Sequence, residues 1–411
     1  MEIYDSLLEA VHREYDKIRL IKKSDRGEVS LIRHRDSGTR YIFRHFCGSS
    51  EVYKMLLNVS CPNLPQIMEV GAKDGRTVLL EEYVQGDTLS DIQEGGLLTT
   101  SEAKQITRQL CSALWVLHSK GVVHRDVKPD NVIMRGKNAV LIDFDASRIY
   151  KTATQEDTQI LGTTGFAAPE QYGLSQSDGR ADIYALGVLL NIMLTGEHPS
   201  RKLAGGRMGR IVQRCTMVNP EKRYKNILHL MEVSSDTPVY LHLPAVTYDG
   251  DITFGDHVWG ISGSKDSDAV TTFTGTVSIK GRDGNYADLT GINFEGEGGI
   301  GLDAYCLVLL TDCNFTGWDT AAIAQNGAWV NAMECTFANN TVGLKFSTSM
   351  AYGTAPNYVN NTFTDNGTAV CIDSLPGSEV IDFAGSVFSG NDTDIENKAD
   401  HAIDTAKATF E

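Results

Sequence analysis

Phenylalanine recurs through the second half of the sequence at intervals of 21, 22, 26 and 25 residues, at Phe294, Phe315, Phe337, Phe363 and Phe388. Each lies in a short segment that ends in glycine or asparagine, such as GINFEG, DCNFTG or NNTFTDN. A repeat of this length, with short strands between turn residues, is typical of a solenoid in which each repeat stacks on the next. We therefore expect one repeat per coil and an internal ladder of phenylalanine rings.

Two cysteines share the period of this repeat. Cys313 and Cys335 each precede a repeat phenylalanine by two residues, so stacked coils would place one above the other as small buried core residues. The eight cysteines contain no Cys-x-x-Cys pair, which argues against a zinc ribbon and against a dense disulfide framework. The repeat pattern resembles that of the right-handed parallel β-helix family, which implies an all-β domain.

The charge of the chain changes sharply near residue 235. Residues 1–234 hold 31 Lys+Arg and 29 Asp+Glu, a net charge of +2, whereas residues 235–411 hold 6 and 24, a net charge of −18. Such a break marks a domain boundary. It predicts one domain over 1–234, a linker over 235–244 and the β-helix over 245–411. An acidic second half is a poor candidate for binding nucleic acid or an anionic membrane.

The sequence also gives an expectation about location. No apolar run approaches the ~18 residues needed to cross a bilayer, so we expect no membrane span. The N-terminal segment alternates acidic and basic residues and does not resemble a secretory signal. Together with the scattered cysteines, these features predict a cytoplasmic protein.

The first half alternates strand-like and helical segments, which indicates a mixed α+β domain. An amphipathic helix is expected at the N-terminus, because Ile3, Leu7, Leu8 and Val11 recur at helical spacing. Further strands are expected over 20–31, 40–46 and 77–84, and further helices over 51–57, 101–119 and 182–194.

Polar residues with a chemical role are concentrated in VVHRDVKPDNVI (122–133) and VLIDFDASR (140–148). LGTTGFAAPEQY, RADIYALG and NPEKRY follow them in that order. This series resembles the bacterial members of the eukaryotic-type serine/threonine protein kinases. The resemblance covers roughly residues 15–233. It implies a bilobal α+β kinase fold, with an N-lobe over about 1–84 and a C-lobe over 85–234, ahead of the β-helix.

The resemblance implies a set of catalytic residues. Asp126 would orient the substrate hydroxyl and accept its proton, and Lys128 would reach the transferring γ-phosphate. Asn131 and Asp143 would bind Mg²⁺ between the nucleotide phosphates, and Phe144 would pack beneath a mobile helix. Phosphoryl transfer needs in-line positioning and cations that neutralise charge on the phosphate oxygens, and these residue types supply both.

The resemblance also implies residues that support the catalytic loop. Thr163 would contact the catalytic aspartate and help to seat the substrate residue. Glu170 would pair with the buried Arg223, and Asp182 would brace the catalytic loop. Asp145 stands where the family has the glycine of Asp-Phe-Gly; it restricts the backbone but removes no metal ligand.

The expected nucleotide site departs from the family pattern. Lys22 and Ser24 occupy the first two glycine positions of the expected G-x-G-x-x-G-x-V loop, so that only Gly27 and Val29 match. Residues 82–84 correspond to the hinge that would hydrogen-bond adenine. The nucleotide-binding residues that the resemblance implies are Gly27, Val29, Ile42, Arg44, Glu51, Glu82, Val84 and Ile133.

The strand lysine of the family is also replaced. Arg44 stands at its position, and Glu51 is the expected carboxylate partner because it is the only acidic residue between Arg44 and Glu69. Arginine forks onto carboxylates and phosphates but is larger and planar, so the exchange is not neutral. Glu81 falls at the rear of the expected pocket, where an apolar residue is commoner.

The function expected from the resemblance is ATP- and Mg²⁺-dependent transfer of the γ-phosphate to Ser/Thr hydroxyls of protein substrates, with Mn²⁺ as an alternative metal. Autophosphorylation is expected at Thr158 or Thr164, where phosphate would pair with Arg125. The acidic β-helix is expected to recognise an unknown partner or ligand. A pseudokinase adaptor is the alternative. A β-helix carbohydrate enzyme would need clustered carboxylates and basic residues, which the sequence alone does not reveal.

Overall fold

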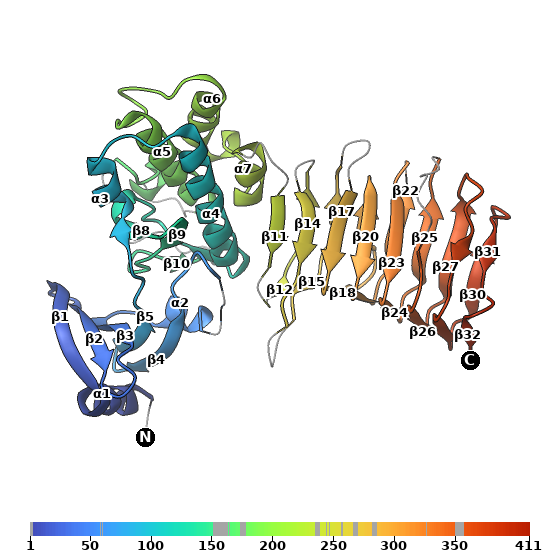
Figure 1. Cartoon of the computed structure of the whole chain (residues 1–411), viewed down its shortest axis with the longest axis horizontal. Coiled ribbons are helices and arrows are strands. Elements are labelled where there is room, and N and C mark those ends of the chain that lie inside the picture. The colour runs from blue at the N-terminus through green and yellow to red at the C-terminus, as the bar shows by residue number, and fades with distance from the viewer. Residues whose placement is uncertain are drawn as a thin grey trace. The chain divides into compact units, whose positions relative to one another are not determined.

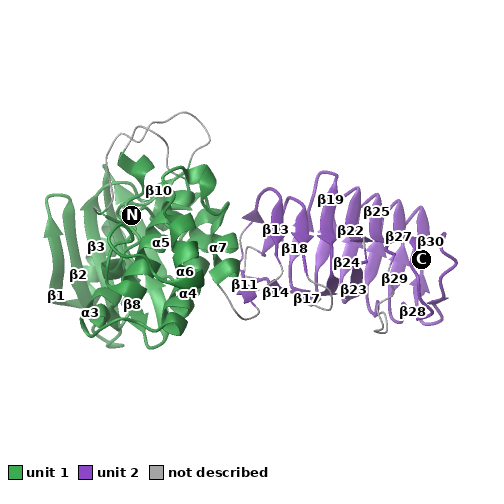
Figure 2. Ribbon diagram, turned by 90° about the horizontal axis from the view of Figure 1, so that it is seen from above, with its two compact units in different colours: residues 1–234 green, residues 235–411 purple. Residues whose placement is uncertain are grey.

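The computed structural model describes residues 3–57, 59, 61–150, 163, 165–172, 178–234, 239–243, 245, 247–255, 258–265, 270–281, 286–325, 327–349 and 357–411. The chain divides into two compact units, Met1–Ser234 and Ser235–Glu411 (Figure 2). Each unit has its own hydrophobic core.

The first part of unit 1 is an antiparallel sheet with strand order β1-β2-β3-β5-β4 (Figure 1). Its core holds Tyr4 and Leu7 of helix α1 against apolar side chains of the sheet, among them Phe43 and Val78. The elements of this lobe are α1 (Ile3–Glu14), β1 (Tyr15–Ser24), β2 (Gly27–His34), β3 (Arg40–Cys47), α2 (Glu51–Met55), β4 (Ile67–Lys73) and β5 (Arg76–Glu82).

The expectation of one strand over 20–31 is wrong. The segment belongs to the β1–β2 hairpin, in which Ser24 pairs with Gly27 and the chain reverses at residues 25–26. A Cβ at Gly27 would lie 2.2 Å from the backbone oxygen of His45, so the hairpin can approach β3 closely only with glycine there. The strand-like composition on both sides of this turn hid the reversal.

The second part of unit 1 is mainly helical. Thr99 and Glu102 form a capping box that starts helix α4, and left-handed Gly196 ends the buried helix α5. Its helices are α3 (Leu89–Glu94), α4 (Thr100–Ser119), α5 (Arg180–Thr195), α6 (Gly206–Cys215), α7 (Ile227–Ser234) and the 3₁₀ turns η1 (Pro129–Asn131), η2 (Pro169–Tyr172) and η3 (Pro220–Lys222). Its strands are β6 (Asp87–Thr88), β7 (Val122–Val123), β8 (Val132–Arg135), β9 (Asn138–Leu141) and β10 (Arg148–Ile149).

Unit 2 is a parallel β-solenoid, which confirms the predicted parallel β-helix (Figure 1). One sheet contains β11 (Val239–His242), β14 (Val258–Ser262), β17 (Tyr286–Thr290), β20 (Leu307–Thr311) and β23 (Trp329–Met333). A second contains β12 (Thr247–Tyr248), β15 (Thr272–Phe273), β18 (Asn293–Glu295), β21 (Asn314–Thr316), β24 (Thr336–Ala338), β26 (Thr362–Thr364), β29 (Val387–Ser389) and β32 (Thr409–Phe410).

The remaining solenoid strands form two more parallel sheets. The larger contains β13 (Ile252–Phe254), β16 (Val277–Ile279), β19 (Ile300–Ala304), β22 (Thr320–Gln325), β25 (Val342–Ser347), β27 (Thr368–Ser374) and β30 (Thr393–Asn397). The smaller pairs β28 (Ile381–Asp382) with β31 (Ile403–Asp404). Strand β11 lies inside the segment expected to be a linker and pairs with β14, so the solenoid includes residues before 245.

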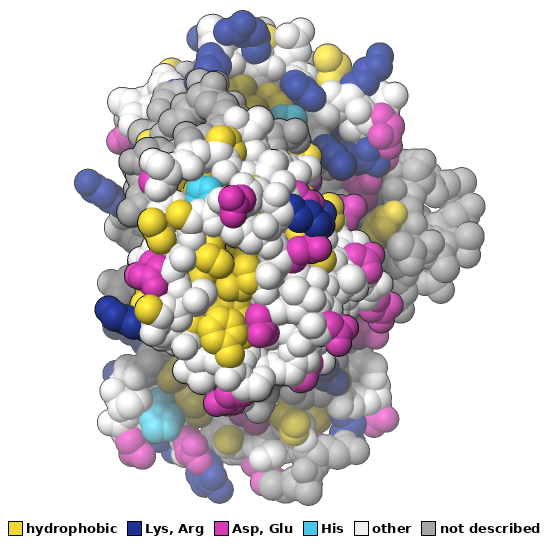
Figure 3. All heavy atoms as spheres, turned by 90° about the vertical axis from the view of Figure 1, so that its right-hand side faces the viewer, with side chains coloured by type: hydrophobic (Ala, Val, Ile, Leu, Met, Phe, Trp, Pro, Cys, Tyr) yellow, Lys and Arg dark blue, Asp and Glu magenta, His cyan; other side chains and the backbone are white. Residues whose placement is uncertain are grey.

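The repeat phenylalanines form the predicted internal ladder. The rings of Phe315, Phe337 and Phe363 stack at centroid distances of 5.0 and 5.1 Å, nearly parallel and fully or almost fully buried. Phe388 continues the ladder to Phe410 on the last coil, whose ring is 48 % exposed. Figure 3 looks onto this end of the solenoid, where apolar side chains gather on the surface.

A second ladder follows the phenylalanines and consists of the buried Asn340 and Asn366 and the half-buried Asn391. The amide nitrogen of Asn340 donates to Asn366 Oδ1 at 3.1 Å, and that of Asn366 donates to Asn391 Oδ1 at 2.9 Å. Each amide also donates to a backbone carbonyl inside the coil, as Asn366 does to Phe337 at 2.9 Å. These bonds satisfy buried polar groups at the turns, which explains why asparagine recurs after the repeat phenylalanine.

Across the described part of the chain, no helix combines the length and apolar character required to cross a bilayer.

Candidate active site

The loop that carries Asp126 is anchored to helix α5. Asp182, fully buried near the start of that helix, accepts hydrogen bonds from the backbone nitrogens of His124 at 2.9 Å and Arg125 at 2.7 Å. Its carboxylate also contacts His118 Nε2 at 2.8 Å. Burial raises the pKa of Asp182, but the hydrogen bond and charge of His118 outweigh it and hold that pKa below its ordinary value.

We expect Asp182→Asn to lower the free energy of unfolding by about 1–3 kcal/mol at pH 7, because the amide provides one acceptor oxygen where the carboxylate provides two. A carboxyl whose pKa is lowered by folding stabilises the fold above its unfolded pKa of about 3.9. That stabilisation disappears as the pH falls through the lower folded pKa. The difference between variant and wild type should therefore shrink below about pH 4.

Urea unfolding of the two chains at several pH values measures this difference. Asp36→Asn, at an exposed turn residue, is the matched control and should leave stability within about 0.5 kcal/mol. A variant as stable as the wild type at pH 7 would contradict the bracing role.

The side chains around Asp126 form a compact hydrogen-bonded set. Its Oδ2 lies 2.8 Å from Lys128 Nζ and accepts from Asn131 Nδ2 at 2.9 Å. Its Oδ1 accepts from the hydroxyl of Thr163 at 2.7 Å, and Lys128 also donates to that hydroxyl at 2.7 Å. Burial raises the pKa of Asp126, but the hydrogen bonds from Lys128 and Thr163 more than offset it and lower the pKa. The carboxylate is therefore ionised at neutral pH.

Asn131 and Asp143 offer oxygen atoms suited to a metal, and their segments are joined by a backbone hydrogen bond from Ile142, the residue before Asp143, to Asn131 at 2.9 Å. Both described side-chain hydrogen bonds of Asn131 use its amide nitrogen. Asp143 presents a carboxylate that is 23 % exposed. Mg²⁺ prefers oxygen ligands, so an amide oxygen and a carboxylate fit it, and Mn²⁺ shares this preference. Asp143 and Arg125 both have left-handed backbones, with φ of 68° and 69°, a conformation that is uncommon away from glycine and often found at functional sites.

The partner expected for Arg44 is corrected by the structure. The guanidinium is buried and its Nε donates to Glu81 Oε1 at 2.8 Å, while Glu51 is exposed and makes no described contact with it. Glu51 lies at the start of the short helix α2, whereas Glu81 lies on β5, the strand directly paired with β3. Strand pairing therefore decides the partner, and nearness in sequence gave the wrong carboxylate.

Arg44 also connects the two lobes. Its terminal nitrogen donates to Asp143 Oδ1 at 3.2 Å and to Asp145 Oδ1 at 3.4 Å. Lys22, at a glycine position of the family loop, reaches within 3.9 Å of both aspartates. Burial on its own raises the pKa of Asp143, but Arg44 and Lys22 outweigh it and lower that pKa. Two cationic side chains thus face the proposed metal ligand from the strands of the first lobe.

The Phe144 ring is buried between the two lobes. It lies edge-on to Tyr53 of helix α2 at 6.0 Å and to His124, two residues before Asp126, at 5.5 Å. It therefore packs against the helix that the family resemblance implied.

The residues expected around adenine come from three strands and the segment after β5. Val29 lies on β2, Ile42 on β3 and Ile133 on β8, and all three are partly exposed. Gly27 starts β2, Val84 is buried just after β5, and Glu82 ends β5 with its carboxylate 2.8 Å from Arg135. That ion pair is a contact that the sequence did not predict.

A bidentate ion pair joins Glu170, after the loop that carries Asp126, to Arg223. Arg223 donates to Glu170 Oε1 at 2.6 Å and to its Oε2 at 2.8 Å, with the arginine side chain fully buried. This is the pairing implied by the resemblance. Thr158 and Thr164, the expected phosphorylation sites, lie outside the described residues.

Three side chains of the site carried no clear signal in the sequence. Gln171 is buried and donates to the backbone oxygen of Arg125 at 3.0 Å. Tyr53 donates its hydroxyl to Asp145 at 3.0 Å, and His118 contacts Asp182. Each acts across more than forty positions of the chain, so only the tertiary structure reveals it. Glu81 did carry a signal, since it directly follows the apolar run 78–80 of β5, at a position where an apolar residue is commoner in the family.

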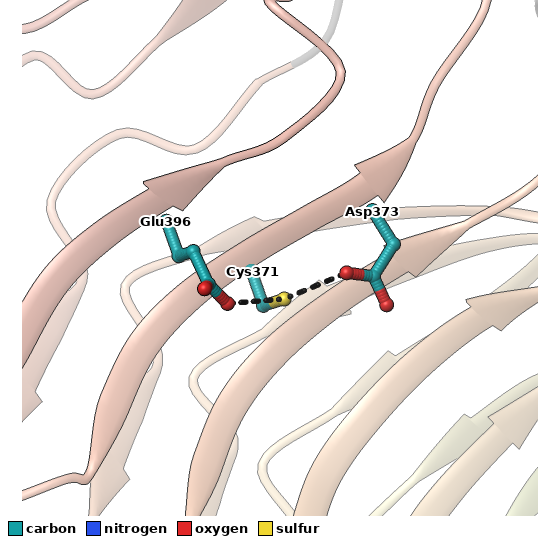
Figure 4. Close-up of side chains that lie close together, drawn as sticks. All are labelled: Cys371, Asp373 and Glu396. Atoms are coloured by element: carbon teal, nitrogen blue, oxygen red, sulfur yellow. Dashed lines mark hydrogen bonds between the residues drawn. The ribbon is translucent and has the colours of Figure 1, made fainter.

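A separate cluster lies in the solenoid. Cys371, Asp373 and Glu396 approach one another on strands β27 and β30 (Figure 4). Their carboxylates already have ammonium partners: Lys345 and Lys398 each lie 3.1 Å from Asp373, and Lys398 lies 2.9 Å from Glu396. Burial raises the pKa of the Cys371 thiol to about 11, so it is a protonated donor at neutral pH. Asp373 and Glu396 therefore form an ion-pair cluster with Lys345 and Lys398.

Comparison with known proteins agrees with the geometry of unit 1. The protein kinase domain profile matches residues 9–238. A probable serine/threonine-protein kinase of Clostridium perfringens is 35% identical over 174 residues, which are 42% of this chain and 25% of the relative. Serine/threonine-protein kinase pkn2 of Myxococcus xanthus is 32% identical over 164 residues, 37% of this chain and 20% of the relative.

A probable serine/threonine-protein kinase PknB of Lactococcus lactis is 33% identical over 203 residues, 45% of this chain and 32% of the relative. The chain thus spans a third or less of the length of these three relatives. The kinase profile nevertheless covers more than half of the chain and ends close to the boundary of unit 1. The chain belongs to the protein kinase family.

Proposed function

We propose that the chain is an ATP- and Mg²⁺-dependent protein serine/threonine kinase that also phosphorylates itself. The observation that carries the proposal is the hydrogen-bonded set of Asp126, Lys128, Asn131 and Thr163. Asp143 directly follows Ile142, whose backbone nitrogen donates to the backbone oxygen of Asn131 at 2.9 Å. Together these residues combine an ionised acceptor, a cation and metal-ligating oxygens, which is what phosphoryl transfer requires.

The residues divide the work of the reaction. The Asp126 carboxylate would hold the attacking hydroxyl and take its proton, because its lowered pKa keeps it ionised. The Lys128 ammonium, 2.8 Å from it, would neutralise charge that develops on the transferring phosphate. Asn131 and Asp143 would hold Mg²⁺, which when bound supplies charge neutralisation at the nucleotide phosphates. Thr163 would seat the hydroxyl-bearing substrate residue beside Asp126.

The nucleotide and the solenoid complete the proposal. Val29, Ile42 and Ile133 would enclose adenine, with the backbone of Glu82 and Val84 hydrogen-bonding its edge. The acidic solenoid would recognise a partner or ligand of the kinase, since its net charge of −18 sets it apart from unit 1. The cytoplasmic location expected from the sequence remains a prediction.

Removal of Mg²⁺ tests the metal dependence. With γ-labelled ATP and a generic basic protein as substrate, excess EDTA should lower phosphate transfer by about a hundredfold or more, because the phosphate charges lose their counterion. Added Mg²⁺ should restore transfer, and Mn²⁺ should restore it at least in part. EDTA saturated with Mg²⁺ beforehand is the matched control and should have no effect.

Mass spectrometry of the same samples reads out autophosphorylation at Thr158 and Thr164. Transfer that persists at full rate in EDTA would contradict metal dependence. A pure chain that binds nucleotide but transfers no phosphate to itself or to the substrate would instead support the pseudokinase adaptor. Arg44 and the altered glycine loop are the features that make this adaptor the alternative.

A further inference from the structure

The carboxylate that pairs with Arg44 comes from a different element than the family pattern implies. A cation at this place is expected to pair with a carboxylate of the following helix, yet helix α2 offers Glu51, which is exposed and not in contact with Arg44. The carboxylate that does hold Arg44 comes from β5. Glu81 and Arg44 have side chains only 5 % and 7 % exposed, so this pair is closed off from solvent.

The guanidinium uses two of its nitrogens for two tasks. Nε donates to Glu81 at 2.8 Å, and the terminal NH1 donates to Asp143 at 3.2 Å and to Asp145 at 3.4 Å. This geometry depends on the rigid planar fork of arginine, because bonds on one edge fix the direction of the other. A lysine ammonium is a single point charge and cannot bind Glu81 on one side while it directs a separate donor at Asp143 and Asp145 on the other.

Helix α2 reaches the same network without a carboxylate. Tyr53, buried on α2, donates its hydroxyl to Asp145 Oδ1 at 3.0 Å, the oxygen that Arg44 also contacts. The Tyr53 ring packs edge-on against Phe144. Asp145 therefore connects helix α2 to Arg44 and to the loop that carries Asp143.

Several residues that differ from the family pattern are therefore in contact with one another. They are Arg44 for lysine, Asp145 for glycine and Glu81 for an apolar residue, together with Tyr53 where the helix directs no carboxylate at Arg44. Resting on the proposed kinase function, we propose that Glu81 and Asp145 are positioning residues: Glu81 anchors Arg44, and Asp145 ties helix α2 to it through Tyr53, so that Asp143 is held in place for Mg²⁺ and the nucleotide.

Stability alone does not account for the buried pair. Glu81 Oε2 is buried and has no hydrogen-bond partner among the described residues, which is costly for a carboxylate oxygen. Burial also raises the pKa of Glu81, against the lowering effect of Arg44. Replacing a buried ion pair with apolar residues of similar volume is often neutral or stabilising. The presence of Glu81 is therefore better explained by its orienting the Arg44 guanidinium than by a gain in stability.

The test compares full-length chains with single substitutions. Glu81→Gln keeps the size of the side chain but removes its charge, and Tyr53→Phe removes only a hydroxyl. Glu51→Gln changes the carboxylate that the sequence pattern favours as partner. Glu69→Gln, at an exposed residue of β4 in the same sheet, is the silent control. Two readouts are taken: Mg²⁺-dependent binding of a fluorescent ATP analogue, and kcat and KM for Mg-ATP.

Glu81→Gln should weaken Mg²⁺-dependent nucleotide binding about 10- to 100-fold, the usual effect of losing a group that orients a metal ligand. Tyr53→Phe should weaken it in the same direction by a smaller factor. Glu51→Gln and Glu69→Gln should stay within about twofold of wild type, because neither carboxylate contacts the network. Arg44→Lys should weaken binding too, although it restores the residue type of the family.

Nucleotide-independent unfolding separates positioning from folding. The double variant Arg44→Met/Glu81→Met should unfold no more easily than wild type, yet should lose Mg²⁺-dependent binding at least as strongly as Glu81→Gln. Normal binding by Glu81→Gln together with impaired binding by Glu51→Gln would overturn the proposal. So would improved binding by Arg44→Lys.

The binding readout also distinguishes this proposal from the proposed function. If wild type binds Mg-nucleotide but transfers no phosphate, the kinase proposal fails while the variants still decide the role of Glu81. If wild type is active and Glu81→Gln matches it in both readouts, only the anchor proposal fails. A wild-type chain that binds no Mg-nucleotide would overturn both.

Discussion

Replacement of Asp126 by asparagine should lower the rate of phosphate transfer by about 10²–10⁴-fold, the range typical of a general base. Asparagine keeps the shape of the side chain and can still accept hydrogen bonds from Lys128 or Thr163. Its amide cannot take up a proton, and it carries no charge to hold the ammonium of Lys128 at 2.8 Å. The loss should therefore fall on kcat, with Mg-ATP binding nearly unchanged because Asp126 is not among the proposed metal ligands.

The loop contains its own matched control. Asp130, four positions further along the same loop, is exposed and takes no described part in the hydrogen bonds around Asp126. Asp130→Asn should therefore stay within about twofold of wild type. Label transfer to a generic basic protein and to the chain itself measures both variants at matched purity. Equal transfer by wild type and Asp126→Asn would indicate a contaminating kinase and would favour the adaptor hypothesis.

Part of the candidate site was predictable from the sequence because a single loop carries several of its residues. Asp126, Lys128 and Asn131 lie within six positions, so a short segment brings them together once Asp182 holds its backbone. Glu170 and Arg223 lie far apart, and their pairing was available only through the family resemblance. The residue types indicate which chemistry is available, but whether residues distant in sequence lie in contact depends on the tertiary fold.

The partner of Arg44 depends on strand order, which the sequence does not reveal. The nearest carboxylate in sequence, Glu51, lies at the first position of a five-residue helix and faces solvent. Glu81 is thirty-seven positions away, but β3 and β5 are antiparallel neighbours, which places it diagonally across from Arg44. The apolar residues before Glu81 mark it as an unusual position in the sequence, but only the strand order shows that Glu81 reaches Arg44.

The solenoid was predictable for a different physical reason. A parallel stack repeats the same environment at every coil, so its core residues recur at a nearly constant interval and reveal the register. Its start was harder to predict. Strand β11 pairs in parallel with β14 but lies before the first clear repeat, in a short segment whose buried Val239 and Leu241 alternate with exposed neighbours. That alternation is too short to separate a strand from a linker.

Replacement of Phe337 by alanine should destabilise the solenoid by about 3–5 kcal/mol. The ring is fully buried, with stacked neighbours on both sides at 5.0 and 5.1 Å, so its removal leaves a cavity that a regular parallel stack cannot collapse to fill. Each kcal/mol shifts the melting temperature of a unit of this size by roughly 2–4 °C, so the expected decrease is roughly 6–20 °C.

Thermal unfolding of the full chain with and without Mg-nucleotide identifies the transition concerned, because a ligand of unit 1 raises only the melting temperature of the unit that binds it. The affected transition should be the one that nucleotide leaves unchanged. Phe410→Ala removes the same ring from the same ladder at the last described coil, where it is 48 % exposed and, among the described residues, stacks on Phe388 alone. Its effect should be less than half as large, because part of that ring is already in water and one stacking neighbour is missing. Equal shifts for both variants would mean that the ladder does not stabilise the solenoid through burial between coils.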